Sequence, residues 1–206
     1  MRIIAGEARG RPLRVPAGRK VRPTSDRVRE ALFNILGAAV VGRPVLDLFA
    51  GSGALGLEAL SRGAARAIFV EHDPQVVRIL AENVRRLGFE ERARIVREDV
   101  FRAVPNIIGQ AVAADEGPLR PSREPVPAGW SGIVFADPPY RRGFVLPVLR
   151  LVAPLLGPDG LLVLEHSADE ALPDQAVPSG LRCIDRRRYG DTGISFFVPY
   201  VEEGTA

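Results

Sequence analysis

Short apolar runs recur along the chain, and segments with helical periodicity separate them. The runs that predict strands lie at residues 45–49, 67–71, 94–96, 133–136 and 161–165. After the second run, Asp73 is placed to cap a helix that has Pro74 at its first position and Gly88 at its end. The core side of that helix is predicted to comprise Val76, Val77, Leu80, Val84 and Leu87. Strands and helices alternating at this length predict a parallel, doubly wound sheet with right-handed crossovers.

The two ends of the chain depart from this alternation. Residues 2–15 mix short apolar pieces with glycine and proline, which predicts a hairpin or an extended arm. Residues 24–26 offer N-caps for a helix with an apolar face of Val28, Leu32, Ile35 and Leu36, and with Arg27, Arg29 and Glu30 mostly off it. Residues 182–189 and 194–201 predict an antiparallel hairpin closing one edge of the sheet.

A length of 206 residues suits one α/β domain with at most a small appendage. We expect a basic N-terminal arm and helix over residues 1–43, followed by one compact unit over residues 44–206. Within that unit a helix is predicted over about 144–156. Residues 113–130, rich in proline and without clear periodicity, predict a flexible loop.

Charge is unevenly distributed. Residues 1–43 carry 10 Lys and Arg against 3 Asp and Glu, whereas the remainder carries 18 against 22. An arginine-rich arm on a mildly acidic body indicates phosphate contacts, although composition alone is equally compatible with a solvated surface. The single cysteine, Cys183, excludes an internal disulfide and a thiolate metal cluster. No metal site, membrane span or Walker-type phosphate loop is predicted, and a monomer in the reducing cytoplasm is expected.

A glycine-rich loop follows the first predicted strand. Residues 51–56 match the dinucleotide pattern G-x-G-x-x-G, and Glu71 lies 20 residues beyond Gly51, where a ribose-binding carboxylate belongs. The glycines would let the backbone approach a ligand at a helix N-terminus. Because that arrangement serves any nucleoside cofactor, an oxidoreductase dependent on a dinucleotide is a serious alternative.

Asp47 helps to separate the alternatives, because a carboxylate in an apolar parallel strand is costly to bury without a partner. The ammonium of S-adenosylmethionine would be such a partner. Alternatively, Asp47 caps the glycine turn through backbone bonds. Glu71 would hold the ribose hydroxyls, and Asp99 with the Val100 amide would meet the adenine edge. The competing interpretations are a helix cap for Glu71 and a solvated turn acid for Asp99.

An acidic, aromatic turn follows the fourth predicted strand: Asp137, Pro138, Pro139 and Tyr140. Ligands of open α/β sheets bind outside the carboxyl ends of the strands. The Asp137 carboxylate and the Pro138 carbonyl could accept both N–H bonds of an exocyclic amine and aim its lone pair at a methyl donor. The prolines stiffen the turn, and Tyr140 offers a face for an extruded base. The alternative is a strand-terminating turn with Tyr140 in the core.

Together with two further blocks, these residues closely resemble the bacterial RsmD family. The blocks are residues 22–34, RPTSDRVREALFN, and residues 46–62, LDLFAGSGALGLEALSR. That family methylates N2 of one guanine in 16S ribosomal RNA with S-adenosylmethionine. The resemblance implies a Rossmann-like class I methyltransferase fold, mainly parallel, with an antiparallel edge strand and an N-terminal β-hairpin arm. It also implies a 16S RNA substrate within an assembling or assembled small subunit.

The resemblance also implies roles for individual residues. The cofactor pocket would comprise Asp47, Gly51, Ser52, Gly53, Glu71, His72, Asp99 and Val100. The target base would meet Asp137, Pro138, Pro139 and Tyr140. RNA would be held by Arg9, Arg11, Arg22, Thr24, Arg27, Arg141 and Arg142. Methylation of DNA at adenine N6 or cytosine N4 uses the same turn, but no target-recognition domain is evident. A non-catalytic RNA-binding protein that keeps the fold is a further alternative.

Overall fold

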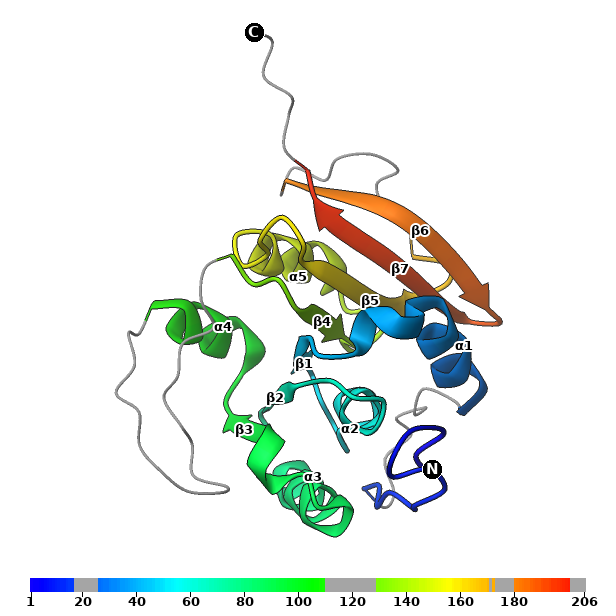
Figure 1. Cartoon of the computed structure of the whole chain (residues 1–206). Helices are drawn as coiled ribbons and strands as arrows, with labels where there is room; N and C mark the ends of the chain where they lie inside the picture. The colour runs from blue at the N-terminus through cyan, green and yellow to red at the C-terminus, as the bar shows by residue number, and fades with distance from the viewer. Residues whose placement is uncertain (17–25, 110–128, 171, 173–179, 201–206) are drawn as a thin grey trace, which may run out of the picture.

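One mixed sheet organises the molecule. The computed structural model describes residues 1–16, 26–109, 129–170, 172 and 180–200. Within these residues, seven strands lie in the order β3-β2-β1-β4-β5-β7-β6 (Figure 1). Their bounds are β1 (Pro44–Leu48), β2 (Arg66–Glu71), β3 (Ala93–Arg97), β4 (Ile133–Ala136), β5 (Leu161–Ser167), β6 (Leu181–Tyr189) and β7 (Thr192–Pro199).

The strand directions confirm the doubly wound sheet. β1 pairs in parallel with β2 and β4, as do β2 with β3 and β4 with β5, whereas β7 is antiparallel to both β5 and β6. The predicted closing hairpin is therefore present, with one refinement. The strand that runs against the others is β7, one place in from the edge, and β6 forms the edge itself. The carboxyl ends of all strands except β7 therefore lie at the same end of the sheet, and it is this end that 'edge' denotes in the description of the site.

Helices cover both faces of this sheet (Figure 1). α1 (Asp26–Leu36), α2 (Ala54–Ser61) and α3 (Pro74–Leu87) pack on one face, and α4 (Val100–Gly109) and α5 (Val145–Val152) pack on the other. Short 3-10 turns at Gly37–Val40 and Glu90–Arg92 precede β1 and β3. Neighbouring strand residues alternate between the faces, so Val45 joins the first core cluster and Leu46 the second. Burial on both faces explains the nearly continuous apolar runs.

The helix α3 follows the local signals closely. The Asp73 carboxylate accepts hydrogen bonds from the backbone N–H groups of Gln75 and Val76, and Gly88 ends the helix at a φ of 77°. Its inward face differs from the prediction at two positions. Val77 is only half-buried. Asn83 is buried, and its side-chain amide donates to the backbone carbonyls of Arg14 and Ser52.

The prediction for α1 was wrong at two positions. Ile35 is 41% exposed, and Phe33 takes the inward position, with its ring centroid 5.7 Å from that of Phe135. Arg29, expected off the apolar face, is fully buried. Its guanidinium donates to the carbonyl of Arg2 and to Asp26, and its Nε lies 3.8 Å from the Glu58 carboxylate. Because the counter-charge comes from another helix, local periodicity could not reveal it.

Sequence reasoning also misjudged the segment between β3 and β5. It did not predict α4, which contains Pro105 in its interior. The helix predicted over 144–156 is shorter, since α5 ends at Val152. Most of the loop predicted over 113–130 lies outside the described residues, but Trp130 at its end is buried in the core. None of the helices within the described ranges is both long and apolar enough to cross a membrane.

The N-terminal arm lies against α2 and α3. Its two sides pair through an antiparallel bridge between Arg2 and Pro12, and the N–H of Ile3 donates to the Arg11 carbonyl at 3.0 Å, as expected for a hairpin. The buried Glu58 carboxylate of α2 accepts the backbone N–H groups of Ile4 and Ala5 at 2.8 and 3.0 Å. The arm is thus anchored to α2 by the Glu58 carboxylate.

We expect Glu58→Ala to lower the free energy of unfolding by about 3–5 kcal/mol, because it removes the buried counter-charge of Arg29 and leaves it paired with the half-exposed Asp26. Urea denaturation measures the loss. Glu82→Ala is the matched control, since Glu82 forms an exposed ion pair with Arg14, and its loss should be about 0.5 kcal/mol. Equal losses in the two variants would contradict the anchoring role of Glu58.

Candidate active site

Four acidic residues gather where the parallel strands end, and all but Glu165 were singled out in the sequence. Asp47 is near the end of β1, Glu71 ends β2, Asp137 follows β4, and Glu165 lies near the end of β5. The strand order makes β1 the neighbour of both β2 and β4. The topology therefore brings the glycine loop and the acidic turn side by side, as the crevice of an open α/β sheet requires.

The glycine loop is held in place by Glu71. The Glu71 carboxylate accepts the N–H of Gly51 at 3.0 Å and that of Asp73 at 2.9 Å. Gly53 has a φ of 82°, and a Cβ there would lie 2.4 Å from a methyl group of Leu80 in α3. A Cβ on Gly51, by contrast, would come no closer than 3.9 Å to another atom. The loop is therefore packed on α3 at Gly53 and open at Gly51.

Asp47 is buried, with 2% of its surface exposed, and its Oδ2 accepts the N–H of Gly56 at 2.8 Å. That bond is the turn-capping contact considered as the alternative role for Asp47. Burial raises the pKa of Asp47 to about 8; the Gly56 bond opposes this rise, and Glu71 adds to it. A cation beside this carboxyl would restore its charge, so the cap and a cofactor contact are compatible.

The ends of β2 and β3 carry the remaining residues predicted for the cofactor. His72 is exposed, with its Nδ1 3.2 Å from the Glu71 carboxylate. Asp99 is exposed and accepts the N–H of Phe101 at 3.0 Å, which makes it the N-terminal cap of α4. Val100 is buried. Asp99 thus has a local structural role in addition to its position after β3, at the carboxyl ends of the parallel strands.

Asp137 occupies the centre of an acidic site. It is half-buried, and its backbone N–H lies 3.4 Å from the Leu48 carbonyl of β1. Burial raises the pKa of Asp137 well above its usual range, and the carboxylates of Glu165 and Asp47 raise it further. Pro138 is buried and Pro139 is exposed. The turn is therefore rigid, partly open and able to hold a proton.

Tyr140 is fixed by residues that the sequence analysis did not assign to the site. Its hydroxyl donates to the Glu165 carboxylate at 2.5 Å and lies 3.4 Å from Oγ1 of Thr192. Burial and Glu165 raise the pKa of Tyr140, so the phenol stays protonated and keeps donating. The ring is half-buried, which leaves part of it exposed. The sequence feature that could have identified Glu165 is a carboxylate near the end of a buried strand.

Three aromatic rings, also missed, line the same edge. Phe49 follows β1 with a φ of 60°, Phe101 lies in α4 and Phe144 precedes α5. Their ring centroids are 5.9 to 6.3 Å apart, and the rings of Phe101 and Phe144 are stacked. All three are half-buried, so they supply an apolar wall beside the acids. Because the three residues are far apart in the sequence, no local pattern predicts that they form a cluster.

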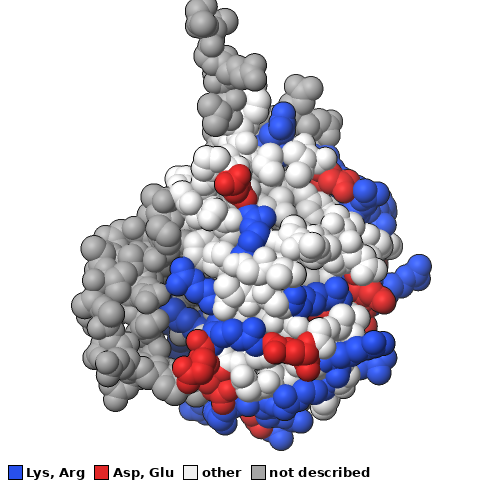
Figure 2. All heavy atoms as spheres, in the orientation of Figure 1, with Lys and Arg blue, Asp and Glu red and all other residues white. Residues whose placement is uncertain are grey.

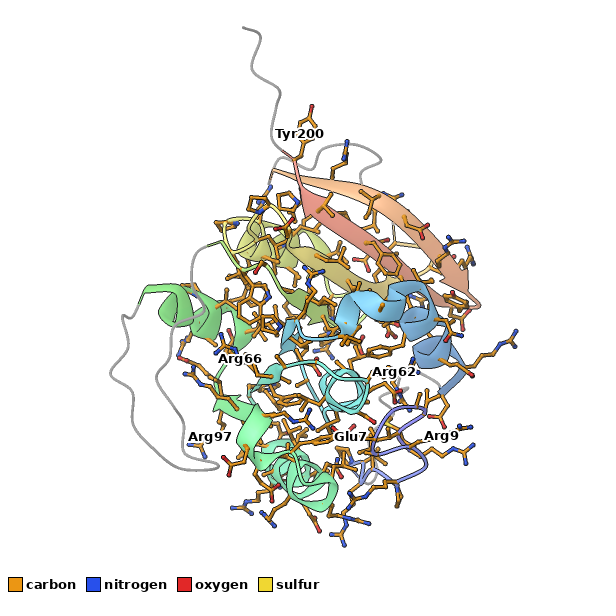
Figure 3. The ribbon with its side chains drawn as sticks, viewed as in Figure 1. Glu7, Arg9, Arg62, Arg66, Arg97 and Tyr200 are labelled. Carbon is orange, nitrogen blue, oxygen red and sulfur yellow. The ribbon has the colours of Figure 1, made fainter. Side chains whose placement is uncertain are left out.

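The arginines predicted to hold RNA fall into separate groups. Arg141 and Arg142 follow Tyr140 and are exposed, and Arg27 is exposed on α1. Arg22 and Thr24 lie outside the described residues. The remaining two are on the arm: Arg9 points outward (Figure 3), and Arg11 donates to the Leu87 carbonyl at 3.1 Å.

Leu87 is the last residue of α3, which runs from the carboxyl end of β2 back to the start of β3. The contact of Arg11 with Leu87 therefore lies at the end of the sheet away from the acidic turn. Basic side chains do line the lower rim of the molecule over α3 and the arm (Figure 2). Among the described residues, no three His, Cys, Asp or Glu side chains gather as they would around a metal ion.

Comparisons with known proteins agree with this arrangement. The family model described as Conserved hypothetical protein 95 matches residues 1–116 and 122–198. Ribosomal RNA small subunit methyltransferase D of Escherichia coli (strain K12) is 39% identical over 175 residues, which is 84% of this chain and 78% of that protein. The chain belongs to the RsmD family. Its fold is the Rossmann-like class I methyltransferase fold.

Solved structures support the fold of this RsmD-family protein. The structure of YhhF from Escherichia coli has a TM-score of 0.77 and 34% identity, covering 98% of this chain and 99% of the other. An RNA methyltransferase from Salinibacter ruber, in complex with S-adenosyl-L-homocysteine, has a TM-score of 0.57 at 19% identity and covers 89% and 97% of the chains. At that identity the likeness concerns the fold alone.

Proposed function

We propose that this protein transfers a methyl group from S-adenosylmethionine to the exocyclic N2 of a guanine in 16S ribosomal RNA. The observation that carries the proposal is the acidic turn at residues 137–140, which follows β4 next to the glycine loop of β1 in a member of this family. The relative in Escherichia coli bears the name of a small-subunit ribosomal RNA methyltransferase.

The glycine loop and its acids suit a nucleoside that carries a cationic methionine group. Gly51 is open to a ligand, Glu71 ends the strand beside it, and Asp47 is a buried carboxyl whose raised pKa favours a neighbouring cation. The bound cofactor would supply an electrophilic methyl group. We assign the cofactor contacts to Asp47, Gly51, Ser52, Gly53, Glu71, His72, Asp99 and Val100.

The acidic turn would activate the amine. A nucleobase amine is a poor nucleophile because its lone pair is delocalised into the ring. The Asp137 carboxylate and the Pro138 carbonyl would accept hydrogen bonds from its two N–H groups, leaving the lone pair aimed at the methyl carbon. The ionised carboxylate of Asp137 would then take up the proton that nitrogen loses after transfer, and its raised pKa makes it a stronger base than a solvated aspartate. The exposed part of the Tyr140 ring, anchored through Glu165, would stack on the extruded base.

Calorimetry and methyl transfer distinguish this proposal from its alternatives. Binding of NAD in place of S-adenosylmethionine would favour the oxidoreductase. Labelled methyl transfer into small subunits from cells that lack the enzyme, compared with transfer into duplex DNA, separates RNA from DNA methylation. Mass spectrometry of the labelled RNA identifies the base, and label on any atom other than guanine N2 would overturn the proposed specificity.

We expect the affinity for S-adenosylmethionine to rise between pH 6 and pH 8, by up to about tenfold per pH unit, and then to level off. The reason is that the cation binds the ionised form of Asp47, whose pKa of about 8 leaves it mostly protonated at lower pH. Calorimetry across this range measures the effect. Asp47→Asn should bind more weakly and without this slope; a slope that persists in the variant would assign it to another group.

A further inference from the structure

Arg141, Asp169 and Arg188 meet at the surface beside the acidic turn. Oδ1 of Asp169 accepts from Nη2 of Arg188 at 3.1 Å, and Oδ2 of Asp169 lies 3.9 Å from Nη2 of Arg141. The three side chains are largely exposed, at 76% for Arg141, 64% for Arg188 and 63% for Asp169. Arg188 also donates to the carbonyl of Gly190 at 3.2 Å. One carboxylate thus lies between two guanidinium groups, one from the turn after β4 and one from β6.

This trio borders the place proposed for the target base. Arg141 directly follows Tyr140, and the Tyr140 hydroxyl reaches Thr192 at the start of β7. Arg188 pairs with Gly193 across the hairpin, next to the pair of Tyr189 and Thr192. It therefore lies at the end of β6 that shares the edge with the acidic turn. A hollow of about 300 Å³ opens there, lined by Arg141, Gly143, Ser167, Asp169 and Glu170.

The backbone at Arg141 is held in an unfavourable conformation. Its φ is 58°, in the left-handed region that residues with a Cβ rarely adopt. Backbone strain of this kind is often found where a ligand is held. The neighbouring Gly143, at a φ of 71°, completes a tight turn. This turn directs the Arg141 side chain toward Asp169 and Arg188.

We propose that Arg141 and Arg188 clamp a backbone phosphate of the RNA next to the target nucleotide, and that Asp169 occupies the phosphate position until RNA binds. Two guanidinium groups around one carboxylate match the way they would surround a phosphate, because both anions present oxygens to the N–H fork. The cofactor loop follows β1, separated from β5 by β4, so this anion site is distinct from it. The inference rests on the proposed RNA substrate and extends it to β6.

The arrangement predicts effects of opposite sign. Arg188→Ala should weaken RNA binding about 5- to 10-fold. It should also reduce the slope of log affinity against log salt concentration by about 0.7, because one phosphate contact with a single strand is lost. Asp169→Asn should strengthen binding a few-fold at low salt, because the two arginines lose their competing anion. In the variant that combines Arg188→Ala with Asp169→Asn, the gain in affinity from Asp169→Asn should be largely lost, because Arg141 is then the one arginine left in the clamp.

The matched control is Arg182→Ala. Arg182 is exposed on the same strand, six residues from Arg188 and therefore about 20 Å away, at the other edge of the sheet. Its replacement should leave RNA binding unchanged. Affinity is measured by fluorescence anisotropy with a single-stranded 16S RNA fragment, and KM and kcat by methyl transfer to small subunits from cells lacking the enzyme. The clamp predicts a raised KM with little change in kcat for Arg188→Ala.

Two results would overturn the clamp: RNA affinity in Arg188→Ala equal to that in Arg182→Ala, or weaker binding in Asp169→Asn. The anisotropy measurement decides this without any methyl transfer. If the wild-type protein binds the RNA but transfers no methyl group to the subunits, the proposed function fails while the clamp still stands or falls on its own data. Unchanged cofactor binding in all variants, by calorimetry, establishes that they are folded.

Discussion

Asp137→Ala is expected to lower the rate of methyl transfer by about 10³-fold while leaving the affinity for S-adenosylmethionine largely intact. The carboxylate would be lost as an acceptor for the amine and as the group nearest the charge that develops on nitrogen, and a preorganised group of this kind contributes 10²- to 10³-fold. Single-turnover transfer into small subunits measures the rate, and calorimetry measures the affinity. Loss of both together would indicate that Asp137 supports the cofactor loop instead.

Two further variants sharpen this result. Asp137→Asn keeps one carbonyl acceptor without the charge, so its rate should lie between those of the wild type and the alanine variant. Asp159→Ala is the matched control, because Asp159 is an exposed turn residue two positions before β5, at the end of the sheet opposite the acidic turn. It should transfer methyl groups at the wild-type rate. An Asp137→Ala enzyme that transferred as fast as this control would exclude the proposed role.

The sheet could be predicted from sequence because its strands are buried on both faces and therefore read as short apolar runs between glycine turns. The cap of α3 is equally local, since Asp73, Pro74 and Gly88 act within a few residues of one another. Arg29 was misplaced for the opposite reason. Its burial depends on Glu58, 29 positions away, and on the Arg2 carbonyl of the arm.

The site likewise contains residues that could be predicted from the sequence and residues that could not. The acids at strand ends could be located because the topology of parallel strands brings their carboxyl ends together. The three phenylalanines and the trio around Asp169 are assembled from distant segments, and no spacing in the sequence links them. The arm illustrates the limit of charge as a guide, since the guanidinium of Arg11 caps a helix carbonyl far from the turn.

Gly53→Val is expected to weaken S-adenosylmethionine binding by at least about 100-fold, which corresponds to about 3 kcal/mol. Valine is strongly disfavoured at a φ of 82°, and its Cβ would lie 2.4 Å from Leu80. Because Leu80 is fully buried, the loop would have to move away from α3, taking the amides of Gly51 and Ser52 with it. Calorimetry measures the affinity, and urea denaturation measures the accompanying loss of stability.

Gly88→Val separates the cofactor site from general backbone strain. Gly88 has a similar φ of 77° at the end of α3, but a Cβ there would meet no atom within 4 Å. The variant should therefore lose stability, by about 1–2 kcal/mol from the left-handed backbone alone, and bind the cofactor normally. If both variants bound S-adenosylmethionine as the wild type does, the glycine loop would not be the cofactor site. If both lost binding equally, backbone strain at either position would explain the effect, and the close approach of Gly53 to Leu80 would not be its cause.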